Sequence, residues 1–164
     1  MKSTDKVLLG IVVGILLLIV VALVVTMTRP EPSYMDEGSP EGVAHNYLLT
    51  LQKEEYERAY GYLSPTVYNY PSSTEEFEKT VTQGYRGFGG DTDVSFSIGD
   101  VEVSGDTATV RVTSSSFYDG DLFDSGQRIK TFDMELALEG NDWKLVDADD
   151  YFARCWRNAD SDCY

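Results

Sequence analysis

The sequence predicts an α+β protein: an N-terminal transmembrane helix, then three helices packed on a curved, mostly antiparallel sheet of about four strands. Two observations predict this order. An uncharged apolar run opens the chain, and apolar residues then recur at helical spacing as far as residue 84. From residue 93 the apolar period changes from 3.6 residues to 2, which is typical of strands. Helices followed by hairpin-connected strands are typical of the α+β class.

The first expected element is a membrane anchor over residues 7–28. Residues 7–25 carry no charge, and with the next three they reach the roughly 20 residues that a helix needs to cross about 30 Å of hydrocarbon. A cleaved signal peptide is the alternative. However, the run exceeds the ~7–15 residues of its usual apolar region, and no small-residue cleavage site follows. The sequence therefore favours a retained signal-anchor.

The charges at its ends predict the orientation of this anchor. Lys2 and Lys6 precede the apolar run, whereas Arg29 alone follows it before the acidic part of the chain begins. This bias favours a cytoplasmic tail at residues 1–6. We therefore expect a single-pass protein of the cell membrane with its C-terminal domain outside.

Gly10 and Gly14 form a GxxxG pair inside the expected anchor. This spacing lets two membrane helices approach closely, which would pair two copies of the chain. Glycine is also common in membrane helices that do not pair, so a homodimer and a single helix both stay open.

A spacer and a first helix follow the anchor. Residues 29–38 contain two prolines and a glycine without any apolar period, which predicts a short, stiff spacer. The folded domain is expected over residues 39–152. Ser39, Pro40 and Glu41 provide an N-cap, a proline at the first helical position and an acid in the first turn. The apolar face of this helix comprises Val43, Ala44, Tyr47, Leu48 and Leu51.

Two further helices are expected before the sheet. The first has apolar or aromatic residues at helical spacing and ends at Ser64 and Pro65. The second begins at Ser73, with Glu76 three residues later as a capping box, and ends at Gly84.

Four strands are expected from residue 93 onwards. The first alternates apolar and polar residues and contains a bulge near Gly99. A turn at residues 104–106 leads to the second strand, and a loop over residues 118–126 leads to the third. A hairpin turn at residues 140–142 precedes the last strand, which starts at Trp143.

The composition excludes several classes of partner. The chain has 28 acidic and 13 basic residues, a net charge of −15. Such a surface repels nucleic acid and anionic lipid head groups. Two explanations of the acidic charge stay open. One is solubility or adaptation to salt, and the other is a cationic partner.

Both cysteines, Cys155 and Cys163, lie in the C-terminal segment 153–164. In an oxidising compartment we expect them to form a disulfide that stabilises the domain by roughly 2–3 kcal/mol. Zinc is disfavoured because two thiolates and the distant His45 do not make a four-ligand site. Redox catalysis is disfavoured because the spacing is not CxxC.

Three segments carry a resemblance to a known family: VAHNYLLTLQKEEYERAYGYLSP, STEEFEKTV and ALEGNDWKLVD. Together they resemble the nuclear transport factor 2-like superfamily, which has a cone-shaped α+β fold, and in particular its membrane-anchored prokaryotic members. The resemblance covers roughly residues 40–150. It implies a pocket enclosed by the helices and the concave sheet. In that superfamily the pocket serves isomerase, dehydratase or hydrolase chemistry, or binds ligands or partner proteins.

Six aromatic residues are the candidate pocket lining or, alternatively, simple core: Tyr47, Tyr60, Phe77, Phe96, Phe132 and Trp143. No catalytic residue is expected among the polar side chains. His45 lies off the apolar face of its helix, and Asp133 and Glu135 alternate with apolar residues, so they should face away from the pocket. No metal and no cofactor is expected.

The acidic loop 119–126 invites a calcium hypothesis. It offers oxygen ligands at Asp119 and Asp121, but Phe123 takes the third position and no closing glutamate follows. An acidic hairpin tip is the alternative.

These patterns favour a membrane-tethered extracytoplasmic module that binds a small apolar ligand or an envelope protein. Two alternatives stay open: a small isomerase or hydrolase of the cone fold, and a structural protein with a filled pocket.

Overall fold

A computed structural model describes residues 3–27, 32–83, 94–118 and 126–163 of the chain. The chain divides into two compact units at Ser33 and Tyr34. The first unit contains α1 (Ser3–Met27). Its segment Val7–Val25 has a mean hydropathy of 3.5, and none of it is buried. Among the described residues, α1 is the one helix long and apolar enough to cross a membrane, as a membrane anchor requires.

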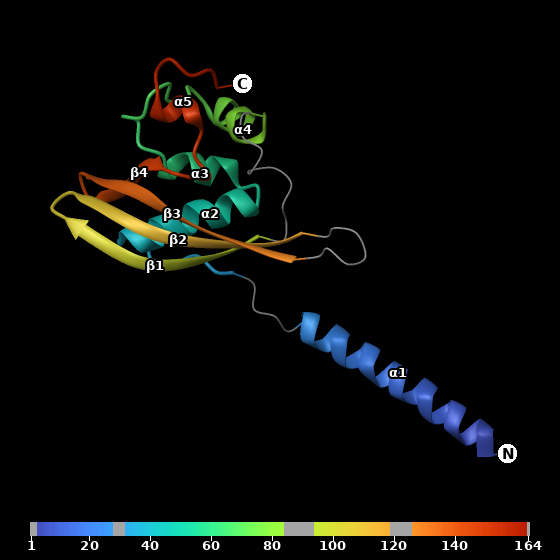
Figure 1. The fold of residues 1–164 in the computed structure, drawn as a ribbon. Coiled ribbons are helices and arrows are strands. Elements are labelled where there is room, and N and C mark those ends of the chain that lie inside the picture. The colour runs from blue at the N-terminus through green and yellow to red at the C-terminus, as the bar shows by residue number, and fades with distance from the viewer. Residues whose placement is uncertain (1–2, 28–31, 84–93, 119–125, 164) are drawn as a thin grey trace. The chain divides into compact units, whose positions relative to one another are not determined.

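The second unit consists of helices, then a sheet, then a short C-terminal helix (Figure 1). The helices are α2 (Pro40–Gln52), α3 (Tyr56–Tyr62), α4 (Thr74–Gln83) and the short C-terminal α5 (Arg154–Arg157). The strands are β1 (Val94–Ser104), β2 (Thr107–Tyr118), β3 (Gly126–Glu139) and β4 (Asp142–Ala148). They form one antiparallel sheet in the order β1-β2-β3-β4. The predicted α+β class is therefore confirmed.

The predicted helix starts are present. Ser39 caps α2, since its hydroxyl accepts a hydrogen bond from the Gly42 N–H at 3.2 Å. Ser73 caps α4 by accepting from the Glu76 N–H at 3.3 Å. The Glu76 carboxylate in turn accepts from the N–H of Ser72, at 2.7 Å, one residue earlier than in a standard capping box. The expected end of this helix at Gly84 lies outside the described residues.

The sheet has the expected irregularities. The register between β1 and β2 shifts between Ile98 and Val101, which is the bulge predicted near Gly99. The hairpin turns contain Gly105 and Gly140 at φ values of 62° and 70°, a backbone region that glycine adopts without strain. β2 and β3 pair without interruption from Thr107 to Tyr118.

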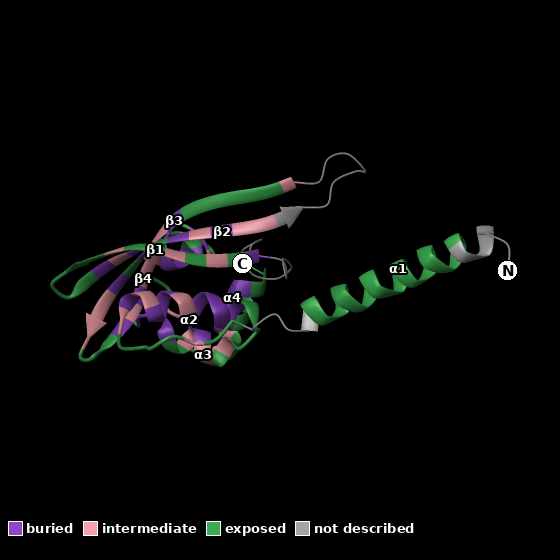
Figure 2. Ribbon diagram, turned by 90° about the horizontal axis from the view of Figure 1, so that it is seen from below, coloured by how far each residue is buried: buried purple, intermediate pink, exposed green. Residues whose placement is uncertain are grey.

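The core lies between one face of the sheet and the helices. α2 packs against β1, β2 and β4, and most of its residues are buried (Figure 2). Val110, Met134 and Leu145 are fully buried there. On the opposite face Asp133 is half-buried and Glu135 is exposed, so both face away from the core as predicted.

The C-terminal segment belongs to this core. The structure joins Cys155 to Cys163 in a disulfide with an S–S distance of 1.97 Å. Trp156, only 1% exposed, stacks on Phe77 with ring centroids 5.4 Å apart. The Asn69 amide donates to the Cys155 carbonyl at 3.1 Å, which ties the segment to the loop before α4.

Candidate functional site

The six aromatic residues expected around a pocket mostly fill the interior of the domain. Tyr47, Phe77 and Phe132 are at most 4% exposed and belong to the hydrophobic core. Tyr60 and Phe96 are partly buried and pack against that core. Trp143 differs, because it also lines a pocket that opens at the surface. Ligand binding by these side chains stays a prediction.

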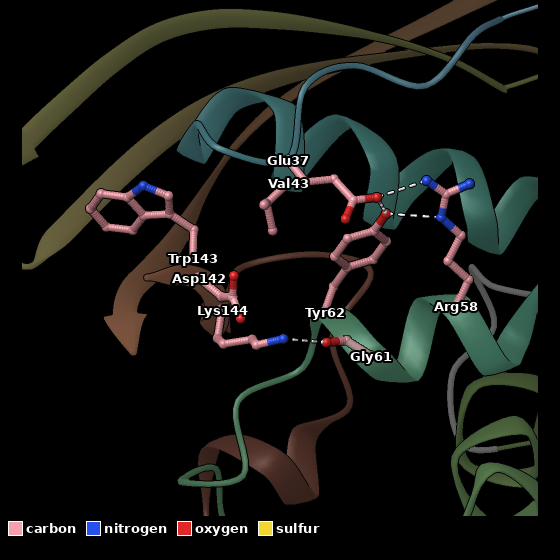
Figure 3. A pocket seen from close by; sticks show the side chains of 8 residues that line it. All are labelled: Glu37, Val43, Arg58, Gly61, Tyr62, Asp142, Trp143 and Lys144. Carbon is pink, nitrogen blue, oxygen red and sulfur yellow. Dashed lines mark hydrogen bonds and ion pairs between the residues drawn. The ribbon is translucent and has the colours of Figure 1, made fainter. Parts of the chain in front are cut away.

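This pocket has a volume of about 290 Å³. It lies among the segment before α2, the helices α2 and α3, and the start of β4 (Figure 3). Its lining residues are Glu37, Val43, Arg58, Gly61, Tyr62, Asp142, Trp143 and Lys144.

The segment 34–38 forms one wall of the pocket because Asn46 holds it against α2. The fully buried Asn46 amide accepts from the Met35 N–H at 2.8 Å and donates to the Met35 carbonyl at 2.9 Å. Gly42 permits the close approach, since a Cβ there would lie 1.8 Å from the Asp36 carbonyl oxygen. The compact domain therefore begins at Tyr34, inside the segment expected as a spacer.

Tyr34 adds an aromatic contact to this attachment. The Arg58 guanidinium lies 3.5 Å from the centroid of the Tyr34 ring, and the Lys53 ammonium lies 5.0 Å from it. The Tyr34 hydroxyl donates to the Glu55 carboxylate at 2.6 Å. Partial burial and this bond to Glu55 raise the pKa of Tyr34. Cation–π contacts at exposed sites contribute about 0.5–1 kcal/mol each.

Glu37, Arg58 and Tyr62 form a closed hydrogen-bonded triad at the pocket wall (Figure 3). The Glu37 carboxylate accepts from the Tyr62 hydroxyl at 2.6 Å and from the Arg58 guanidinium at 2.7 Å. Arg58 also donates to the Tyr62 oxygen at 3.0 Å. The hydrogen bonds from Tyr62 and Arg58 lower the pKa of Glu37. Burial and the bond to Glu37 raise the pKa of Tyr62 to about 12.

The lowered pKa of Glu37 is opposite to the shift that an acid–base role of this carboxyl would require. An isomerase of the superfamily type requires a carboxylic acid kept protonated beside a tyrosine. Glu37 is the carboxylate next to a tyrosine in this pocket, and its pKa is lowered instead. Lys144 donates to the Gly61 carbonyl at 2.8 Å. The result is a small hollow in which apolar side chains, including Val43, lie beside charged groups of both signs.

Acidic residues elsewhere in the domain form ion pairs. Arg157 donates to Asp147 at 3.1 Å and to Asp149 at 3.3 Å, while Lys130 donates to Asp150 at 2.8 Å. Within the described ranges, no group of three or more histidine, cysteine, aspartate or glutamate residues is placed to hold a metal ion. Residues 119–125 of the acidic loop, on which the calcium hypothesis rests, lie outside those ranges. His45 is partly buried on α2.

Sequence reasoning missed the triad and the attachment of segment 34–38. Their partners come from separate parts of the chain, so no periodic pattern marks them. The available signal was a set of polar or amphipathic residues just before α2 and within α3. These residues are Tyr34, Glu37, Arg58 and Tyr62.

No family model matches the chain, and no curated protein matches it. Among solved structures, it is similar to a SEC-C motif containing protein from Rhodopseudomonas palustris at 8% identity and a TM-score of 0.49, covering 70% of this chain and 80% of that one. It is also similar to the intermembrane space region of the chloroplast protein ARC6 at 18% identity and a TM-score of 0.30, covering 71% and 96%. At these values neither likeness carries an argument about this chain.

Proposed function

We propose that the chain is a membrane-tethered, extracytoplasmic binding domain whose partner is a protein of the cell envelope. The observation that carries the proposal is the packing of aromatic residues that the sequence places around a pocket. Tyr47, Phe77 and Phe132 lie in the hydrophobic core of the described domain and are at most 4% exposed. Recognition of a partner therefore falls to the outer surface of the domain.

Two features support the location. The apolar helix α1 is long enough for one membrane crossing, with Lys2 and Lys6 before it. The disulfide between Cys155 and Cys163 is typical of an oxidising compartment, such as the outer side of the cell membrane. A signal-anchor with its N-terminus in the cytoplasm accounts for both features.

A small ligand is the second candidate, and the pocket beside Trp143 favours it. At about 290 Å³ the pocket lies near the lower end of the roughly 300–1,000 Å³ typical of ligand sites. Its apolar contacts and its charged groups would suit a small molecule with an apolar body and a polar end. We rank it second because Arg58 and Lys144 already have protein partners.

The resemblance to the nuclear transport factor 2-like superfamily is part of this proposal. Three helices followed by an antiparallel sheet, with α2 across one face, support it. An enzymatic role gains no support from Glu37, whose pKa shifts in the direction opposite to the one required.

Reporter fusions to the full-length chain test the location. Alkaline phosphatase fused after residue 164 should be active, because it folds outside the cytoplasm, and a fluorescent protein at the same site should stay dark. The reverse pattern would exclude the proposed location.

Native mass spectrometry of the full chain in lipid nanodiscs then separates the two candidates. We expect a mass two hydrogens below that of the reduced chain and no bound small molecule. A co-purifying small molecule that is lost in the Trp143→Ala variant would replace the protein partner with a ligand.

A further inference from the structure

Strand β3 extends well past the end of its neighbour β4. The ladder between them runs from Glu139 to Met134, and the last bond joins the Asp149 N–H to the Asp133 carbonyl at 3.1 Å. Among the residues that the structure describes, no strand pairs with this side of residues 126–132. Figure 2 shows most of this stretch as exposed. Within the described part of the chain, the far half of β3 is therefore an open strand edge.

The bond at Asp133 identifies which backbone groups point outward. In an antiparallel sheet the N–H and C=O of one residue point to the same neighbour, and successive residues alternate. The pairing of β2 with β3 has no bulge over this stretch. Since the Asp133 carbonyl points toward β4, the groups of Gln127, Ile129 and Thr131 also point to the open side. They offer three donors and three acceptors in a row to an incoming strand.

The chain leaves this edge at a strained residue. Tyr151 follows β4 closely and has φ of 57°, which is uncommon for a bulky side chain. Three contacts hold it there: its carbonyl accepts from the Tyr47 hydroxyl at 2.8 Å, and its ring packs on Phe96 and Phe132 at 4.9 and 5.6 Å between centroids. Strained conformations held by such contacts cluster at functional sites. The turn keeps β4 from covering the rest of β3.

The side chains of this edge favour an acidic partner over a second copy. Arg128 and Lys130 share one face of β3, because strand side chains alternate. If two copies paired antiparallel through Ile129, Arg128 of one would lie opposite Lys130 of the other, and like charges in that position destabilise the pair. Carboxylates at the same positions would be attracted. In a chain of net charge −15 such a basic stretch is a distinct feature.

We propose that the open edge of β3 at residues 127–131 accepts an extended, acidic segment of another protein as an added strand. The proposal rests on the proposed function and names the chemistry of the partner. Main-chain hydrogen bonds to Gln127, Ile129 and Thr131 provide affinity. Arg128 and Lys130 favour carboxylates at alternate positions of the segment. A carboxylate opposite Lys130 would share this ammonium with Asp150, to which it donates at 2.8 Å.

The test uses the full chain in nanodiscs and a capped peptide of about eight residues that alternates glutamate with valine. Peptide at saturation should slow amide hydrogen exchange at Gln127, Ile129 and Thr131 by about tenfold or more. Methylating alternate peptide nitrogens on the bonded side should abolish binding, while methylation on the other side should not. Arg128→Glu should weaken binding by about fivefold. Lys79→Glu, an equal charge change on α4, should change it by less than about twofold.

Three outcomes would overturn the proposal. The first is no binding, which would mean that Arg128 and Lys130 protect the edge from pairing. The second is equal binding by both methylated peptides, which would mean attraction without an added strand. The third is protection of the same amides by self-association without peptide. The reporter fusions distinguish failure of the added-strand proposal from failure of the proposed location. An active phosphatase fusion with no peptide binding removes the added-strand proposal alone. An inactive phosphatase fusion with no peptide binding removes the proposed location as well.

Discussion

Two halves of the same sheet have opposite surroundings. Where β4 pairs with β3, the inner face of the sheet carries Val110 and Met134, both fully buried under the helices. Further along the same strands, Arg128 and Lys130 occupy the equivalent face and are exposed. The alternation of side chains is the same in both halves. The change from apolar to charged residues on this face marks where the core ends. The residues that stabilise the domain and those proposed to bind a partner therefore lie in separate parts of the sheet.

The largest effect is expected in the buried core, to which Trp156 of α5 belongs. Trp156→Ala should lower the free energy of unfolding by about 3–5 kcal/mol, because it removes a buried ring that stacks on Phe77. Urea unfolding of the full chain in detergent micelles measures this. Trp156→Phe should cost less, since the indole N–H has no hydrogen-bond partner among the described residues. Ile129→Ala on the exposed part of β3 should change stability by less than about 0.5 kcal/mol. Equal losses at Trp156 and Ile129 would contradict the difference between the buried core and this exposed stretch.

The disulfide should give the next largest effect. Replacing both cysteines, Cys155→Ser with Cys163→Ser, should cost roughly 2–3 kcal/mol, because the link restrains the unfolded chain and holds Trp156 near the core. Unfolding of the wild-type chain with and without reductant measures the same quantity. A variant as stable as the oxidised wild type would show that packing alone holds the C-terminal segment.

A matched pair of amides sharpens the comparison. Asn46→Ala should cost about 1–3 kcal/mol, because this fully buried amide makes two hydrogen bonds to Met35. It should also speed proteolysis within segment 34–38. Gln127→Ala removes an exposed amide of β3 that donates to the Ser115 hydroxyl of β2, and it should cost less than about 0.5 kcal/mol. Similar costs for both would mean that segment 34–38 adds nothing to the domain.

The smallest effect is a dependence on pH. The bonds from Tyr62 and Arg58 lower the pKa of Glu37 below its ordinary 4.5, so their stabilisation is present above that pH and is lost as the pH falls through the lowered value. The side chains of Arg58 and Glu37 are 39% and 55% exposed, so their ion pair should contribute less than about 1 kcal/mol to the free energy of unfolding. Glu37→Gln should flatten this part of the stability curve below pH 5. An unchanged curve for Glu37→Gln would contradict the role of the triad.

Local patterns predicted most elements of this fold. The cap at Ser39, the bulge near Gly99 and the turn at Gly140 are encoded within a few residues, because capping, bulging and turning use neighbouring backbone groups. The pairing of Cys155 with Cys163 was also predictable, since the chain has only two cysteines. The apolar helix α1 was evident from its length and lack of charge.

Only the tertiary structure decided which aromatic residues pack in the core and which line a surface. Tyr47 and Trp143 have the same kind of pattern in the sequence, but the first is fully buried and the second reaches a pocket. The attachment of Met35 to Asn46, the burial of Trp156 and the open edge of β3 depend on segments that meet after folding. Periodicity shows which face of an element is apolar, whereas long-range packing determines what covers that face.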